Sequence, residues 1–188
     1  MLLKTNYEIG KIPHSEYPRP QLVRDSYLTL NGEWDLSKKC EDNSIKDYGK
    51  ILVPFSPESQ NSGVGADFTL GGKETLVYNR EFTVEEGFIA GATLIHFGAV
   101  DWKAEVFVDG QLAGEHTGGY APFSFDITPA LAAKGANKLE VRVWDPTDKS
   151  FQPRGKQVSN PSGIWYTPVS GIWQTVWLEP VSEKHIAN

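Results

Sequence analysis

SGIWYTPVSGIWQTVWLEP, residues 162–180, is the stretch that decides the fold of this chain. It contains Ser-Gly-Ile-Trp twice, at 162–165 and 170–173, and three of the six tryptophans. Residues 172–178 predict a strand with two largely apolar faces, one of Ile172, Val176 and Leu178 and the other of Trp173, Thr175 and Trp177. Such a strand is central in a two-layer domain or offers one face to another protein. Glu179–Pro180 is expected to end it, because proline cannot donate a ladder hydrogen bond.

Short strands at regular spacing fill the rest of the chain. Alternating or apolar runs predict strands at 27–36 (with an internal turn), 51–55, 76–84, 92–97, 102–108, 111–116, 124–127 and 138–144. Asp109–Gly110 is a two-residue turn signal that joins two of them as a hairpin. Residues 37–50 are expected to be looped and 56–73 to form a mobile, functional connection. One helical turn, capped by Thr128 and closed by Gly135, is predicted.

This pattern predicts an all-β fold, an antiparallel two-sheet sandwich of the jelly-roll kind. A chain of 188 residues suits one domain. We divide it into an extended arm at 1–26, the sandwich at 27–181, and the start of a linker to a next domain at 182–188.

Charge, cysteine count and hydropathy limit the classes of binding partner and the cell compartment that we expect. The net charge of −6 is spread without a basic run, which argues against nucleic acid and against an anionic membrane. The single cysteine, Cys40, excludes an internal disulfide and a cysteine-rich zinc site. No apolar stretch approaches the length of a membrane span, so we expect a cytoplasmic protein or one whose secretion signal has been removed.

Three polar residues interrupt the apolar pattern. Asp145 is the next residue in the inward phase of strand 138–144, and Asp101 lies at the junction before Trp102. Either aspartate could be a turn cap bonded to its own backbone, or could face a ligand where the sandwich opens. Arg80 intrudes on the apolar face of strand 76–84, and we expect it to pair with a carboxylate.

Several of these runs resemble one known family. The run 163–180 is similar to the end of the N-terminal sugar-binding domain of glycoside hydrolase family 2, the family of β-galactosidases, β-glucuronidases and β-mannosidases. Residues 30–34 and the segment 98–123, which includes His116, resemble the same domain. The resemblance covers most of the chain, from Leu30 to Pro180.

The resemblance also implies site residues. Phe97–Asp101 and Trp144–Asp145 look like the two segments whose carboxylate or amide side chains reach into the catalytic pocket, so Asp101 and Asp145 would bind sugar hydroxyls. The run 153–157 resembles a loop from which Arg154, Lys156 and Gln157 could contact the mouth of the active site. Trp165 or Tyr166 could stack on a sugar ring, or instead pack on the next domain. Asp148 is a weaker candidate.

The family's retaining chemistry needs two carboxylic residues about 5 Å apart, which the resemblance places on a downstream barrel. Nothing in this chain matches them, so we expect it to be catalytically inert by itself. The implied function is a non-catalytic domain that packs on immunoglobulin-like and barrel domains of the same protein and helps to bind a terminal β-glycoside. An independent carbohydrate-binding, lectin-like module is the alternative. A plain interaction domain, with Trp173 and Trp177 at its interface, is a third reading.

No cofactor is expected. The four histidines show no metal-ligand spacing, and calcium, which some jelly rolls use, has no oxygen-ligand motif to support it.

Overall fold

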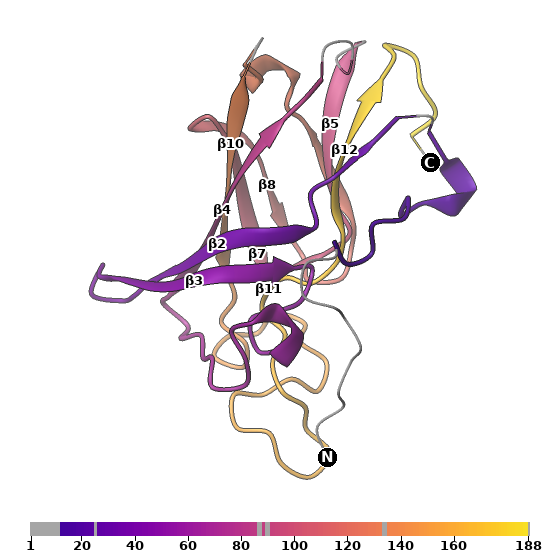
Figure 1. The fold of residues 1–188 in the computed structure, drawn as a ribbon. Coiled ribbons are helices and arrows are strands. Elements are labelled where there is room, and N and C mark those ends of the chain that lie inside the picture. The colour runs from indigo at the N-terminus through magenta and orange to yellow at the C-terminus, as the bar shows by residue number, and fades with distance from the viewer. Residues whose placement is uncertain (1–11, 25, 86–87, 89–90, 133–134, 188) are drawn as a thin grey trace.

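The computed structural model describes residues 12–24, 26–85, 88, 91–132 and 135–187. Its strands form two layers, a four-stranded sheet of order β1-β12-β5-β9 and a six-stranded sheet of order β3-β2-β4-β10-β7-β8 (Figure 1). A two-stranded pair, β11-β6, lies at one end. All strand pairs described are antiparallel, and the chain crosses between the layers as in a jelly roll. The predicted all-β sandwich is confirmed.

The strands and short 3-10 turns have the following bounds: η1 Pro20–Leu22, β1 Leu28–Thr29, β2 Gly32–Lys39, β3 Ile45–Val53, η2 Gln60–Ser62, β4 Thr75–Thr83, β5 Ala92–Phe97, β6 Val100–Asp101, β7 Lys103–Val108, β8 Gln111–Thr117, β9 Phe123–Asp126, η3 Thr128–Ala130, β10 Ala136–Trp144, β11 Gly171–Ile172 and β12 Val176–Val181.

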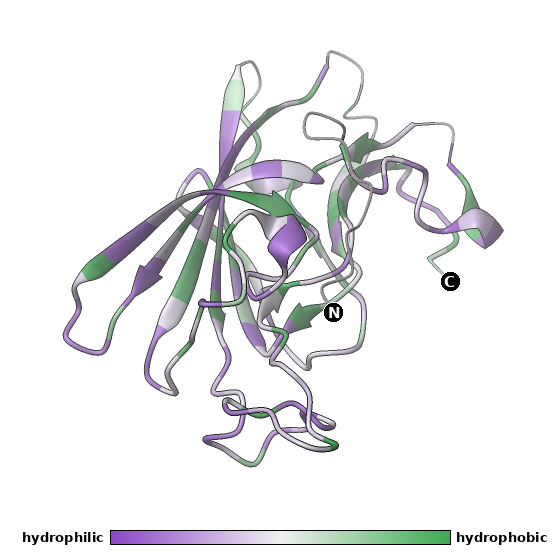
Figure 2. Cartoon of the chain, turned by 60° about the horizontal axis from the view of Figure 1, so that its bottom comes forward, coloured by the Kyte–Doolittle hydropathy of each residue, from purple (hydrophilic) through white to green (hydrophobic). Residues whose placement is uncertain are grey.

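The core forms where the inward phases of the two sheets meet. β4, β7 and β10 alternate buried and open positions, as their sequences predict. Figure 2 shows that strands of the sandwich carry both hydrophobic and hydrophilic residues along their length. The predicted β7–β8 hairpin is also confirmed, because Asp109 and Gly110 both have positive φ, +48° and +79°. Trp102, expected to point inward with Ala104, is only half-buried.

The tryptophan-rich run 172–178 is not one strand. It divides into β11, which pairs with β6, and β12, which lies between β1 and β5. β12 is therefore a central strand, and Trp177 on it is buried, so it is not part of an exposed interface.

Pro180 does not end β12, contrary to our expectation. It pairs with Thr93, whose N–H and C=O bond to Thr128 and Ile127, on the side away from β12. The nitrogen of Pro180 therefore faces the β1 side. β1 begins at Leu28, which pairs with Leu178, so β1 has no residue in the ladder opposite Pro180. No donor is needed there, and the strand continues to Val181.

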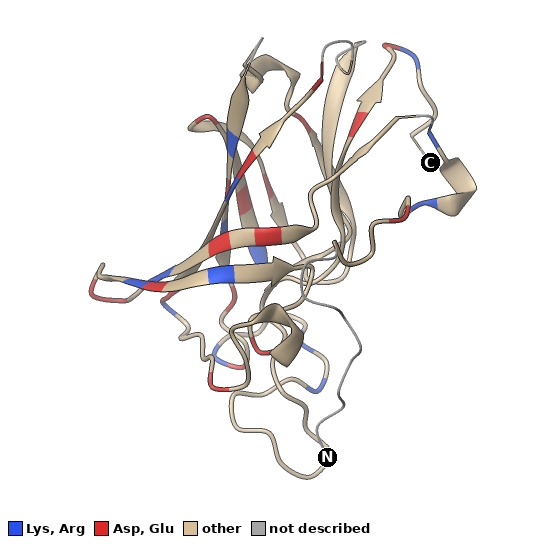
Figure 3. Cartoon of the chain, viewed as in Figure 1, with Lys and Arg blue, Asp and Glu red and all other residues tan. Residues whose placement is uncertain are grey.

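Two expected loops are ordered. Residues 37–50, predicted to be looped, lie mostly in β2 and β3, a hairpin whose charged residues of both signs are visible in Figure 3. The sequence hides these strands because β3 is a sheet edge with mostly exposed side chains, as edge strands often are. The connection 56–73 includes η2 and buries Glu58 and Ser62, so it is anchored rather than loose.

Two local expectations are wrong in detail. Arg80 donates to the backbone carbonyls of Leu30 and Asn31 (2.6 and 2.9 Å) and lies over the Trp34 ring, so backbone oxygens take the place of the expected carboxylate. The helical turn is the 3-10 segment η3, whose cap position is Ile127. Thr128 instead donates its hydroxyl to Asp126. Ala133, at the predicted end of that turn, lies outside the described residues.

Within the described part of the chain, no helix has the length and apolar character needed to cross a membrane.

Candidate functional site

One end of the sandwich gathers the segments that carry the predicted site residues. The loop after β3, the β6–β11 pair and the long loop after β10 meet there, at the lower end of Figure 1. Asp101 closes β6, directly opposite Gly171 of β11, and is 4% exposed. The peptide bond from Asp101 to Trp102 is cis. The junction that the sequence singled out is thus a buried corner of the molecule.

Asp145 reaches the same end from the other sheet. It continues the inward phase of β10 past Val143 and is 3% exposed, as the alternation predicts. Its Oδ1 accepts a hydrogen bond from the backbone N–H of Thr147 at 2.7 Å. The turn-cap reading of Asp145 is therefore confirmed, and the reading as a ligand contact stays a prediction.

A third carboxylate, Glu58, was not predicted. It comes from the loop after β3, is 7% exposed, and accepts hydrogen bonds from the hydroxyl and the N–H of Ser170, at 2.5 and 3.2 Å. The sequence marked its loop as functional by length, but no period or motif marks the residue. We call Glu58, Asp101 and Asp145 the carboxylate end.

The carboxylate end lacks a compensating cation. No lysine, arginine or histidine in the described segments forms an ion pair with any of its three members. Burial raises the pKa of Asp101 to about 7, with the charges of Asp145 and Glu58 adding to the effect. Burial likewise raises the pKa of Glu58 and of Asp145. Burial and the neighbouring like charges both favour the protonated form of these carboxyl groups.

Gln157 links the long loop to this end. Its side chain lies by the Asp101 carboxylate and lowers the pKa of that group, while its amide donates to the Tyr120 hydroxyl at 3.4 Å. Its Oε1 accepts from the N–H of Val169 at 2.6 Å. Of the predicted loop residues, Gln157 is therefore brought to Asp101.

The other predicted loop residues lie farther out. Arg154 donates to the backbone carbonyl of Gln157 at 3.1 Å, and Lys156 lies over the Tyr166 ring, 5.7 Å from its centroid. The Trp165 side chain is exposed, and the backbone N–H of Trp165 donates to the backbone carbonyl of Ser162. Asp148, the weaker candidate, accepts from the hydroxyl and N–H of Ser159. These contacts hold the loop together, but none of them joins the loop to Glu58, Asp101 or Asp145.

Gly119 closes over Asp101. A Cβ at Gly119 would stand 2.5 Å from Asp101 Oδ1, so only glycine permits this approach. The carbonyl of Gly119 accepts from the Trp173 indole N–H at 2.9 Å. Backbone and an aromatic side chain thus shield the carboxylate from one side.

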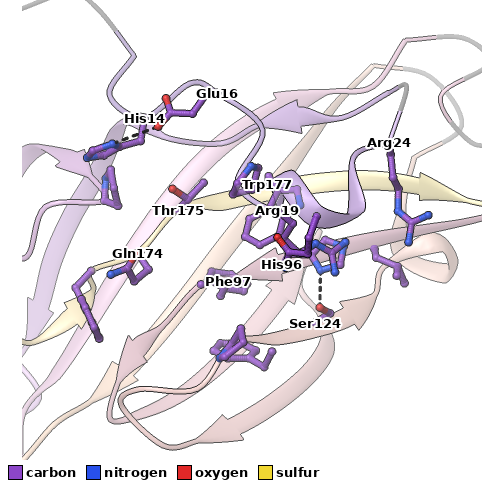
Figure 4. Close-up of a pocket in the computed structure, with 18 of the residues that line it drawn as sticks. His14, Glu16, Arg19, Arg24, His96, Phe97, Ser124, Gln174, Thr175 and Trp177 are labelled. Carbon is purple, nitrogen blue, oxygen red and sulfur yellow. Dashed lines mark hydrogen bonds and ion pairs between the residues drawn. The ribbon is translucent and has the colours of Figure 1, made fainter. Parts of the chain in front are cut away.

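A separate groove of about 940 Å³ lies outside the four-stranded sheet and does not include the carboxylate end. Figure 4 shows Arg19, Arg24, His96 and Trp177 gathered along it. Below them Glu179 is fully buried and is bonded to Tyr17, Arg19, Arg24 and Trp177 at 2.5–2.9 Å.

His96 adds to this cluster. It stacks on Trp177, with its Nε2 3.3 Å from the Glu179 carboxylate. Burial alone would raise the pKa of Glu179, but the hydrogen bonds from His96, Tyr17, Trp177 and Arg19 hold it well below its usual range. We call this cluster the Glu179 centre. It joins the segment 17–24 to the outer face of the sheet.

Among the described residues, no group of three or more His, Cys, Asp or Glu side chains has the geometry of a metal site.

Jelly-roll sandwiches host many unrelated functions, carbohydrate binding among them, so the comparison with known families decides the class. Residues 63–179 match the family model described as the sugar binding domain of glycosyl hydrolases family 2. The chain belongs to this family, as its sugar-binding domain, and the predicted resemblance is confirmed.

Similar proteins are glycosidases of that family. A β-galactosidase of Thermoanaerobacter pseudethanolicus is 36% identical over 112 residues, which are 59% of this chain and 14% of the relative. A β-galactosidase of Bacteroides ovatus is 33% identical over 134 residues, 71% of this chain and 14% of the relative. The chain thus spans about one seventh of the length of these relatives.

A solved structure of a β-glucuronidase from Bifidobacterium dentium, complexed with coumarin-3-O-glucuronide, superposes with a TM-score of 0.60 at 27% identity. The match covers 83% of this chain and 30% of that one. A β-galacturonidase from Eisenbergiella tayi superposes with a TM-score of 0.58 at 26% identity, covering 84% and 25%.

Proposed function

We propose that this chain is the non-catalytic sugar-binding domain of a retaining β-glycosidase, and that its carboxylate end completes the substrate pocket on a catalytic barrel. The observation that carries the proposal is the meeting of Asp101 and Asp145. Two sheets deliver these carboxylates to one end, where they are buried and have no ion-pair partner among the residues that the structure describes. A structural ion pair would have supplied a cation, whereas a sugar supplies hydroxyl donors.

The chemistry suits a terminal sugar. A carboxylate accepts hydrogen bonds from ring hydroxyls, and such bonds can strengthen as the glycosidic bond breaks. A carboxyl with a pKa of about 7 can also donate one, so the pair Asp101 and Asp145 can serve a hydroxyl in either role. Gln157 adds amide donors beside Asp101. The domain's task would be to hold the sugar, while bond cleavage would occur on the barrel.

One observation supports the alternative, an independent carbohydrate-binding module. Phe151, Trp165, Tyr166 and Tyr120 are exposed on or beside the loop after β10. Exposed aromatic side chains can stack on sugar rings, and a free-standing binder uses such a platform. The same residues would equally suit a contact with a neighbouring domain.

Calorimetric titration of the chain with galactose, mannose and glucuronate separates the two. We expect no detectable binding at millimolar sugar, because one wall of a pocket should hold a sugar poorly. Micromolar binding that is lost in Trp165→Ala would favour the independent module.

The pocket role is tested in the polypeptide that joins this domain to its barrel. Asp145→Ala should lower kcat/KM for an aryl β-glycoside by about 100-fold, whereas Asp67→Ala, an exposed aspartate, should leave it unchanged. Equal activity in both variants would contradict the pocket role.

A further inference from the structure

Glu58 occupies an unusual position in the fold. The loop after β3 carries it into the interior, where both carboxylate oxygens accept hydrogen bonds from one residue, Ser170. Ser170 is itself fully buried and directly precedes β11. The two residues lie 112 positions apart in the chain, so this contact ties two distant segments together.

Ser170 leads directly to the two proposed sugar ligands. Its neighbour Gly171 pairs with Asp101 across the β6–β11 ladder. The Ser170 side chain also lies within hydrogen-bonding reach of Asp145, where it lowers the pKa of that carboxyl. Glu58 therefore holds a residue that lies beside Asp145 and directly before the ladder partner of Asp101.

β11 leaves little room for adjustment. Gly171 has a φ of +73°, and a Cβ there would collide with the hydroxyl of Tyr78. The segment 170–171 is thus fixed by Glu58 on one side and by Tyr78 on the other. A displacement of Ser170 would also displace Asp101, because the next residue, Gly171, is paired with Asp101 in the β6–β11 ladder.

The charge of Glu58 acts beyond its contact with Ser170. Its two oxygens accept both Ser170 hydrogen bonds, which the single acceptor oxygen of a glutamine amide could not do in the same way. The carboxylate also faces a cluster of like charge, formed by Asp145 and Asp101, with Tyr78 beside it. Its charge therefore bears on the protonation of the proposed sugar ligands, in addition to its hydrogen bonds.

We propose that Glu58 is a positioning residue, which acts through Ser170 to place Asp101 and Asp145 against the sugar and to set which of them holds a proton. This inference rests on the proposed function of the carboxylate end.

The test compares Glu58→Gln with Glu81→Gln, a matched change at an exposed site on β4. In the polypeptide joined to its barrel, Glu58→Gln should lower kcat/KM about tenfold, mainly through KM, while Glu81→Gln should match the wild type. In the isolated chain, carbon-13 NMR of the carboxyl groups should show the pKa of Asp101 falling in Glu58→Gln, because a neighbouring negative charge is gone.

Ser170→Ala is the second variant, in case Glu58→Gln does not fold. It removes only a hydroxyl and should reproduce the rise in KM, although the Glu58 charge remains.

The outcomes separate the two proposals. If Asp101→Ala and Asp145→Ala impair the enzyme while Glu58→Gln and Ser170→Ala behave like Glu81→Gln, with an unchanged Asp101 titration, the inference is overturned and the pocket role stands. If the aspartate variants are fully active as well, both proposals fail.

Discussion

Two buried carboxylate centres in this domain differ in how their charge is met. The Glu179 centre surrounds one carboxylate with two arginines, a tyrosine hydroxyl and an indole N–H. The carboxylate end places three acidic side chains together, and their hydrogen-bond partners among the described residues are hydroxyl and amide groups. The pKa of Glu179 is lowered, and those of Glu58, Asp101 and Asp145 are raised.

The contrast is the one expected if Glu179 is structural and the carboxylate end makes the proposed sugar contacts. A paired carboxylate holds segments together, whereas carboxylates buried beside like charges cost stability and are typical of functional sites. Similar burial therefore has opposite meanings at the two centres.

The largest expected effect comes from breaking the paired centre. Glu179→Ala leaves Arg19 and Arg24 without their shared partner and should reduce the free energy of unfolding by about 3–5 kcal/mol. Urea denaturation measures it, with the exposed Glu183→Ala as control. A loss below about 1 kcal/mol would show that Glu179 does not anchor the segment 17–24.

The two centres should respond to pH with opposite signs. The folded-state pKa of Asp101, about 7, exceeds its ordinary value of 3.8, so the folded state binds more protons and stability falls as the pH rises from about 4 to about 7. Glu179, with a lowered pKa, contributes stability above its ordinary value of 4.5 that is lost only in more acidic solution.

Asp101→Asn should remove the Asp101 part of this slope, at most about 1.4 kcal/mol per pH unit. Urea denaturation between pH 4.5 and 7.5 measures it, with Asp67→Asn as the exposed control. Parallel curves for wild type and Asp101→Asn would mean that Asp101 titrates alike in the folded and unfolded chains.

Gly119→Ala tests the shielding of Asp101. The new Cβ would stand 2.5 Å from Oδ1, and the displacement should cost about 1–3 kcal/mol. Ala121→Ser, an exposed change two residues away, should cost almost nothing. Thermal unfolding followed by circular dichroism compares them, and equal melting temperatures would show that the corner yields easily.

The smallest effect is expected on the outer loop. Phe151 is fully exposed, so Phe151→Ser should change the free energy of unfolding by less than about 0.5 kcal/mol. The same urea denaturation measures it. A larger loss would place this ring in a packed contact.

Much of the sandwich could be predicted because its inner strands obey a period of two. β4, β7 and β10 bury alternate residues, and the same phase led to Asp145. Only the last residues of β3 fall in the strand predicted at 51–55; its first part, 45–50, was predicted as a loop, because an edge strand solvated on most of its length shows no apolar phase.

Non-local contacts account for what the sequence could not predict. Glu58 accepts a hydrogen bond from Ser170, 112 residues away, and Arg80 donates to the carbonyl of Leu30, 50 residues earlier. A local sequence pattern cannot predict either contact. Gln157 was found through family resemblance, whereas Glu58 belongs to no run that resembled the family. A single strand was predicted at 172–178, because the alternation of its side chains does not show that β11 pairs with β6 while β12 pairs with β5.

A series of deoxy substrates tests the proposed contact between Asp145 and a sugar hydroxyl. In the polypeptide joined to its barrel, kcat/KM of wild type and Asp145→Ala would be compared on 4-nitrophenyl β-galactoside and its 3-, 4- and 6-deoxy forms. We expect a loss of about 100-fold on the parent substrate that nearly disappears on the one deoxy form lacking the partner hydroxyl. The same loss on all four substrates would contradict a hydroxyl contact and would return Asp145 to the role of a turn cap.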